Sequence, residues 1–200
     1  MSFVNPHKSY EITMTEAPTD HQTSIGTESS SIKVWDPVVR LFHWTVVTGC
    51  AVDYFLLSDG ETAHRWVGYI VGIALVVRIV WGFLAGGHAR FANFVRGPRT
   101  IIEYLRTLKK GEAPRHVGHN PAAAVMIVTL MLTLATIIVT GWMQTTDSYW
   151  GVGWVQDLHG LATDGLMALV VVHASAAVFE SMRHRENLIW SMITGLKRVE

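Results

Sequence analysis

Four long apolar runs dominate the chain after residue 34, and they predict four transmembrane helices. The runs cover residues 38–57, 66–85, 122–143 and 158–180. Each is close to the roughly 20 residues that an α-helix needs to cross a bilayer. Lipid allows only helices or closed barrels to span it, and these runs are too long and continuous for barrel strands. We therefore expect an all-α fold, a four-helix transmembrane bundle.

The first 34 residues have a different character. Residues 1–34 are rich in Ser, Thr and Glu and follow neither a helical nor a strand period, which is typical of a disordered segment. They lack the apolar core of a signal peptide. We interpret 1–34 as a cytoplasmic tail and 35–200 as one membrane domain.

The distribution of charge predicts an orientation. Lys+Arg and Asp+Glu balance at 16 each, so overall charge does not indicate nucleic-acid binding. Basic residues gather in the N-terminal segment, in the connection between the second and third runs, and in the C-terminal segment, whereas the 144–157 connection has none. Because basic segments stay inside, both termini are expected in the cytoplasm, with the protein multi-pass in a bacterial inner membrane.

The long basic connection contains one further predicted element. Residues 97–110 place apolar side chains at helical spacing with basic residues between them, after a Gly-Pro start. This pattern predicts a short amphipathic cytoplasmic helix. It could lie on the inner leaflet or pack against the ends of the bundle.

Four histidines lie within the apolar runs or at their ends: His43, His64, His159 and His173. Ionisable residues are costly in a membrane and therefore indicate function more often than elsewhere. The only cysteine is Cys50, so an internal disulfide and the C-x-x-C-H attachment of covalent c-type haem are both excluded.

The spacing of these histidines predicts two pairs at two depths. His159 and His173 are 14 residues apart, which returns them to nearly the same helix face about 21 Å apart along the axis. The alternating direction of the spans then puts His43 with His173 on the cytoplasmic side, and His64 with His159 on the periplasmic side. Each pair draws on two helices at one depth, as bis-imidazole ligation of a haem iron requires.

Other uses of the four histidines account less well for this division. A zinc site needs ligands that converge on one point. A proton relay could include the carboxylates Asp53 and Asp164, but it would not explain why the histidines pair at two matching depths. Arg78 lies 14 residues after His64 and could pair with a haem propionate while its stem stays in lipid. Snorkelling to lipid phosphates is the alternative for this arginine.

At these residues the chain resembles the prokaryotic cytochrome b561 superfamily, which includes the b-type cytochrome subunits of nickel–iron hydrogenases. The resemblance is carried by VWDPVVRLFHW around His43, by HRWVGYIVGIALVVRIVWGF from His64 through Arg78, by PRHVGHNPAAAVM, and by the His159 and His173 pair. It implies two non-covalent b-type haems with the four histidines as ligands. Arg78 matches an arginine of the family near the inner end of the second span, which implies that it helps to bind a haem.

The resemblance also implies a function. The expected activity is transmembrane electron transfer between the quinone pool, ubiquinone or menaquinone, and a periplasmic c-type cytochrome or hydrogenase-like protein. We expect the quinone site near His43, Trp44 and Arg78; an outer site near Asp53 and Asp164 is the rival. A homodimer is a further possible assembly of the chain. The alternatives are a self-contained superoxide:quinone oxidoreductase and a haem-free membrane anchor.

Overall fold

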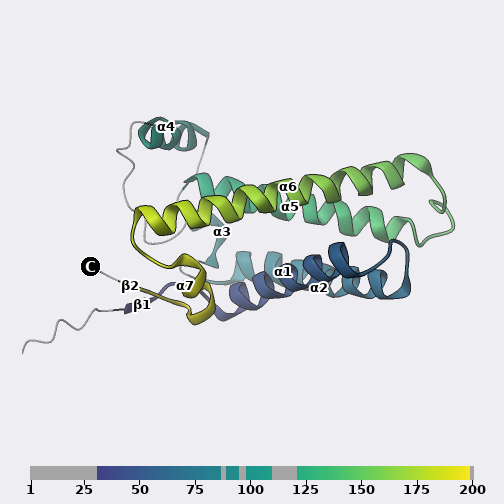
Figure 1. Cartoon of the computed structure of the whole chain (residues 1–200), viewed down its shortest axis with the longest axis horizontal. Coiled ribbons are helices and arrows are strands. Elements are labelled where there is room, and N and C mark those ends of the chain that lie inside the picture. The colour runs from purple at the N-terminus through teal and green to yellow at the C-terminus, as the bar shows by residue number, and fades with distance from the viewer. Residues whose placement is uncertain (1–30, 87–88, 95–97, 110–120, 199–200) are drawn as a thin grey trace, which may run out of the picture.

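The computed structural model describes residues 31–86, 89–94, 98–109 and 121–198. Four long helices lie side by side along one direction (Figure 1): α1 (Pro37–Leu56), α2 (Thr62–Leu84), α5 (Pro121–Met143) and α6 (Gly153–Arg183). The shorter elements are α3 (Phe91–Phe94), α4 (Pro98–Lys109), α7 (Leu188–Thr194) and the strands β1 (Ser31–Lys33) and β2 (Leu196–Arg198). The described chain is thus helical apart from one two-stranded sheet.

Three of the described helices, α2, α5 and α6, are long and apolar enough to cross a membrane. The helix α1 has 20 residues but carries Arg40, His43 and Asp53, and it is not among the three. Large apolar side chains on the long helices face outward, for example Ile73 and Leu132 at 66% and 64% exposure. An apolar surface of this extent needs a nonaqueous covering, which a bilayer provides.

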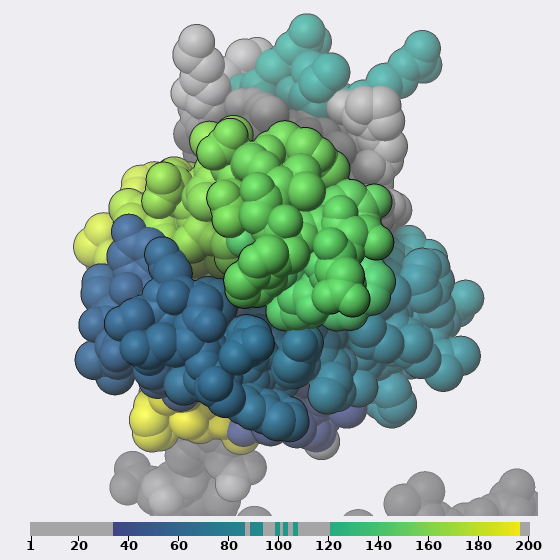
Figure 2. All heavy atoms as spheres, turned by 90° about the vertical axis from the view of Figure 1, so that its right-hand side faces the viewer, coloured from purple at the N-terminus to yellow at the C-terminus, as the bar shows by residue number. Residues whose placement is uncertain are grey.

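The bundle consists of two helical hairpins. The helices α1 and α2 pack together, α5 and α6 pack together, and contacts between α2 and α5 join the hairpins. Figure 2 looks along the bundle at the connections 57–61 and 144–152, with the first hairpin in blue beside the green α5–α6 hairpin. The core between them contains four buried side chains, Val71, Leu75, Leu134 and Leu166.

The threonines of α5 illustrate how polar groups are accommodated in an apolar helix. The hydroxyls of Thr133, Thr136 and Thr140 each donate a hydrogen bond to a backbone carbonyl one turn earlier. Such bonds satisfy the hydroxyl without a solvent partner. A run of threonines therefore does not interrupt this span.

The two ends of the described chain meet at one end of the bundle. Strands β1 and β2 pair antiparallel, with Ser31 opposite Arg198. Residues 31–34 were expected in the polar tail, but 31–33 form β1 and Val34 is buried. The partner of β1 lies more than 160 residues away in the chain, so local pattern could not indicate this strand. The rest of the expected tail, 1–30, lies outside the described residues.

Side-chain hydrogen bonds reinforce this end. Trp35 Nε1 donates to Ser191 Oγ at 3.1 Å, and Arg40 donates to the carbonyls of Met192 and Ile193. Gly195 ends α7 in the left-handed region (φ 83°), and a Cβ there would lie 2.9 Å from Arg40 Nη1. Both the turn and the close approach therefore favour glycine at this position.

The amphipathic helix expected over 97–110 is present as α4 (Pro98–Lys109). It contacts α5 and otherwise stands apart from the bundle in Figure 1. Residues 97 and 110 lie outside the described part of the chain.

Candidate functional site

The four histidines of the apolar runs meet in two pairs. His64 of α2 faces His159 of α6 with ring centroids 6.1 Å apart, and we call these two the loop pair. His43 of α1 faces His173 of α6 with ring centroids 6.5 Å apart, and we call these two the termini pair. These are the partners that the depth argument predicted, with α6 contributing one histidine to each pair.

The separations within the pairs fit a shared iron atom. Two imidazoles that bind one iron from opposite sides have centroids about 6 Å apart, because each iron–nitrogen bond is about 2 Å and each centroid lies about 1 Å beyond its nitrogen. The described residues contain no group of three or more His, Cys, Asp or Glu that could hold a metal. Two ligands per centre suit a metal whose other positions are filled by a macrocycle.

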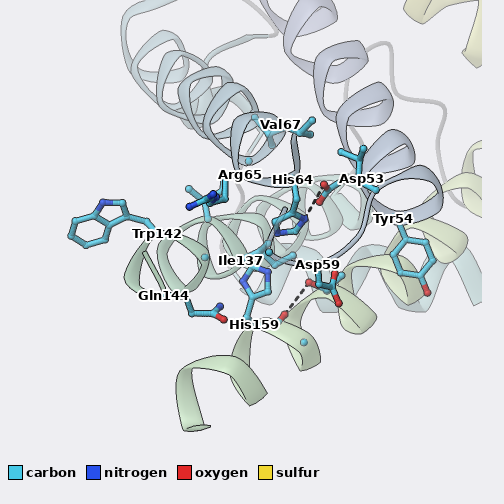
Figure 3. A pocket seen from close by; sticks show the side chains of 18 of the residues that line it. Asp53, Tyr54, Asp59, His64, Arg65, Val67, Ile137, Trp142, Gln144 and His159 are labelled. Carbon is cyan, nitrogen blue, oxygen red and sulfur yellow. Dashed lines mark hydrogen bonds and ion pairs between the residues drawn. The ribbon is translucent and has the colours of Figure 1, made fainter. Parts of the chain in front are cut away.

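In the loop pair, both Nδ1 atoms have a polar neighbour. His64 Nδ1 lies 2.9 Å from Asp53 Oδ1, and His159 Nδ1 lies 3.0 Å from Thr140 Oγ1. Figure 3 shows the Asp53–His64 contact as a dashed line. Contacts of this kind fix the ring orientation and leave Nε2 of each histidine for a metal.

A cleft of about 1030 Å³ adjoins the loop pair and is lined by parts of α1, α2, α5 and α6 (Figure 3). Gly68 and Gly160 line it, and a Cβ added at either would meet nothing within 4 Å. Gly141 also lines the cleft and lies against the loop pair, because a Cβ there would be 3.1 Å from His159 Cε1. A cleft of this volume accommodates a cofactor the size of haem.

The termini pair has different surroundings. The His43 ring packs edge-on against Trp44, with centroids 5.3 Å apart. Its Nδ1 is buried and has no hydrogen-bond partner within the described part of the chain. A buried polar nitrogen without a partner is costly.

Arg78 is buried deep in the bundle, at 3% exposure. Its Nη2 donates to the carbonyl of Ala89 at 3.3 Å, and its guanidinium carbon lies 4.7 Å from the centroid of the Phe91 ring. Its Nη1 is buried without a hydrogen-bond partner among the residues described here. This nitrogen is available to a carboxylate, as an arginine that binds a propionate would need.

Sequence reasoning missed two contributions to the site. Asp53 was noted as a carboxylate in an apolar run, but not as a neighbour of His64. The sequence did not indicate a role for Thr140, because the hydroxyl of a threonine in a membrane helix usually bonds to a backbone carbonyl of its own helix. Asp164, the other carboxylate noted, is exposed and lines the cleft.

Apolar helices that hold two interhelical histidine pairs, one beside a cofactor-sized cleft, define a membrane cytochrome of the b type. Comparison with known families agrees, since residues 34–195 match the family described as prokaryotic cytochrome b561. The chain belongs to this family. It is a bacterial membrane protein of the haem b class that transfers electrons.

Several curated relatives cover most of the chain. One from Rhodobacter capsulatus is 29% identical over 83% of this chain and 81% of its own length. One from Bradyrhizobium diazoefficiens is 30% identical over 82% of this chain and 85% of its own length. Both are named "Probable Ni/Fe-hydrogenase B-type cytochrome subunit". No solved structure matches the chain.

Proposed function

We propose that this protein is a di-haem cytochrome b that carries electrons across the membrane between quinone and a redox partner. When bound, haem b supplies reversible one-electron chemistry. His64 and His159 would hold one iron, and His43 and His173 the other. An iron held by two of these histidines would keep no open position for oxygen, which favours electron transfer over ligand activation.

The observation that carries the proposal is the position of both pairs on one helix. His159 and His173 are separated by 14 residues of α6, which is about 21 Å of helix and most of a hydrocarbon core about 30 Å thick. The two centres therefore sit near opposite membrane surfaces. The fold supports this assignment, because three other helices contact the two α6 histidines. The helix α1 contributes His43 beside His173, while α2 and α5 contribute His64 and Thr140 beside His159.

The proposed orientation places the loop pair toward the periplasm and both termini in the cytoplasm of an inner-membrane protein. In this arrangement α1 is the fourth span, and its polar Asp53 and His43 face other helices instead of lipid. The 144–152 connection has no basic residue, whereas Arg40, Arg183 and Arg185 lie at the other end. This asymmetry follows the positive-inside tendency of short loops.

The proposed partner docks at the periplasmic surface. Trp150 and Trp154 are 74% and 56% exposed next to the cleft end of the bundle, and Tyr149 packs on Trp154. Exposed aromatic side chains are common anchors of protein interfaces. The relatives' names make a hydrogenase-like protein the first candidate, and a c-type cytochrome the second. A homodimer through the exposed apolar helix faces is also proposed.

Ubiquinone or menaquinone is the proposed membrane substrate. We place its site near the termini pair, where Trp44 is partly exposed and Arg78 supplies a buried cation. The rival site is the cleft at the loop pair, with Asp53 and Asp164 as carboxylates. Carboxylates suit proton transfer to or from a quinone, which keeps the second site in consideration.

The cleft disfavours the superoxide:quinone alternative. Among the described residues that line it, three are acidic, Asp53, Asp59 and Asp164, and Arg65 is the one arginine or lysine. A surface with excess negative charge repels an anionic substrate. A haem-free anchor would not explain why the ring centroids in both pairs are separated by nearly the same distance.

Haem content tests the proposal. The purified protein should hold two b-type haems per chain and show two reduction potentials in an optically monitored redox titration. A reduced-minus-oxidised spectrum without a b-type α-band would establish the anchor instead. Superoxide-dependent quinone reduction by the isolated chain would establish the oxidoreductase.

A further inference from the structure

We propose that Asp53 tunes the loop pair through His64 and makes that haem the lower-potential centre of the two. The inference rests on the di-haem function proposed above. Asp53 is here a positioning residue, because it acts on the iron through the imidazole ring between them.

The carboxylate of Asp53 lies directly beside the His64 ring. Asp53 Oδ1 lies 2.9 Å from His64 Nδ1, and the two side chains are only 26% and 23% exposed. Figure 3 shows the carboxylate aimed at the far nitrogen of the ring, on the side away from His159. Oδ1 has no hydrogen-bond partner among the described residues, so this contact acts through its charge. A carboxylate this close to the far nitrogen of a ligating histidine makes the ring a stronger electron donor. A more electron-donating ligand stabilises oxidised iron, which lowers the reduction potential.

Neither histidine of the termini pair forms an ion pair with a carboxylate in the described part of the chain. His43 Nδ1 has no hydrogen-bond partner in the described ranges, and its nearest aromatic neighbour is Trp44. An imidazole without an anionic partner donates less charge to its metal. The iron held there is expected to accept an electron more readily.

Fixed charges in the cleft act in the same direction. The cleft beside the loop pair contains the carboxylates of Asp59 and Asp164 in addition to Asp53, against the single cation of Arg65. The other half of the bundle holds the buried guanidinium of Arg78, with the carboxylate of Asp36 near the same end of α2. Negative charge stabilises ferric haem, so the excess of carboxylates at the cleft acts in the same direction as Asp53. One electron shared between the haems would reside mainly at the termini pair.

A first experiment assigns the potentials without altering Asp53. Redox titration of wild-type protein should resolve two potentials; finding fewer would contradict the proposed function, not this inference. His43→Ala should remove the termini-pair haem and leave the loop-pair haem alone. The potential of the remaining haem should match the lower wild-type value. A match to the higher value would overturn the proposed order.

A second experiment tests Asp53 directly. Asp53→Asn should raise the reduction potential of the loop-pair haem. The equilibrium ratio of one electron between the two haems should then shift about tenfold toward the loop pair, which corresponds to 59 mV for a one-electron couple. Asp164→Asn is the matched control: it removes a carboxylate from the same cleft and should shift this potential much less. The termini-pair potential should stay unchanged in both.

The conservative variant protects this test against loss of haem. Asp53→Glu keeps the carboxylate, so it should retain the loop-pair haem and a potential closer to wild type than Asp53→Asn. Equal shifts in Asp53→Asn and Asp164→Asn would show a general charge effect and overturn the role of Asp53. If Asp53→Asn cannot hold the haem, failure of Asp53→Glu to keep the low potential would overturn it.

Discussion

The two histidine pairs bring the same side chains together in two environments. In the loop pair each Nδ1 has a polar neighbour and a wide cleft with three carboxylates lies alongside. In the termini pair His43 Nδ1 is buried without a partner in the described chain and packs on an indole ring. The comparison teaches that two pairs of identical residues differ in the atoms beyond them, and in a metal centre such atoms tune the ligands.

The largest expected effect comes from removing a proposed haem ligand at either end. His173→Ala should remove the termini-pair haem and His159→Ala the loop-pair haem, each halving the haem content, because the pairs share no ligand. A haem assay with a reduced-minus-oxidised spectrum measures this. His184→Ala is the control, since His184 lies outside both pairs and contacts Glu180. Loss of both haems in a folded His173→Ala protein would contradict independent centres.

A smaller effect is expected from crowding the loop pair alone. In Gly141→Ala the new Cβ would lie 3.1 Å from His159 Cε1, so the ring must move, at a cost of roughly 1–3 kcal/mol in haem binding. Gly72→Ala is a matched control, because its Cβ meets Ile138 Cγ2 at the same 3.1 Å. Haem retention during dilution should fall at the loop pair only in Gly141→Ala. Equal retention in both variants would show that the site does not need glycine there.

The smallest effect is expected from removing one hydroxyl. Thr140→Val deletes the contact with His159 Nδ1, and loss of one neutral hydrogen bond costs about 1 kcal/mol. The loop-pair haem should therefore dissociate several-fold faster, while the termini pair is unaffected. Thr136→Val, whose hydroxyl bonds only to the carbonyl of Leu132 among the described contacts, should change neither haem. A changed haem dissociation rate at the termini pair would mean that the two environments are coupled.

Local patterns predicted much of the helical part of this structure. The expected run 158–180 lies inside α6, and α2 begins four residues before the expected run 66–85 and ends at Leu84, so both helices begin in more polar sequence. A helix continues past its apolar stretch because its hydrogen bonds are local, and water or headgroups solvate the polar ends. The boundaries were therefore less accurate than the existence of the helices.

Contacts between distant segments were beyond the reach of local patterns. The pairing of β1 with β2 was not predicted, and residues 31–34 belong to the fold instead of to the expected tail. The Arg78 contacts with Ala89 and Phe91 depend on how the chain turns back after α2. Such contacts are set by packing geometry, which three-residue strands and turns do not encode locally.

The sequence by itself determined the long helices and the positions of the four histidines along them, because helix length and the 3.6-residue period follow from the chain alone. The tertiary structure alone decided which groups stand behind those histidines. Asp53 reaches His64 across the α1–α2 connection, and Thr140 reaches His159 across the α5–α6 connection. Both contacts depend on the rotation of one helix against its neighbour, and that rotation is fixed by side-chain packing between helices.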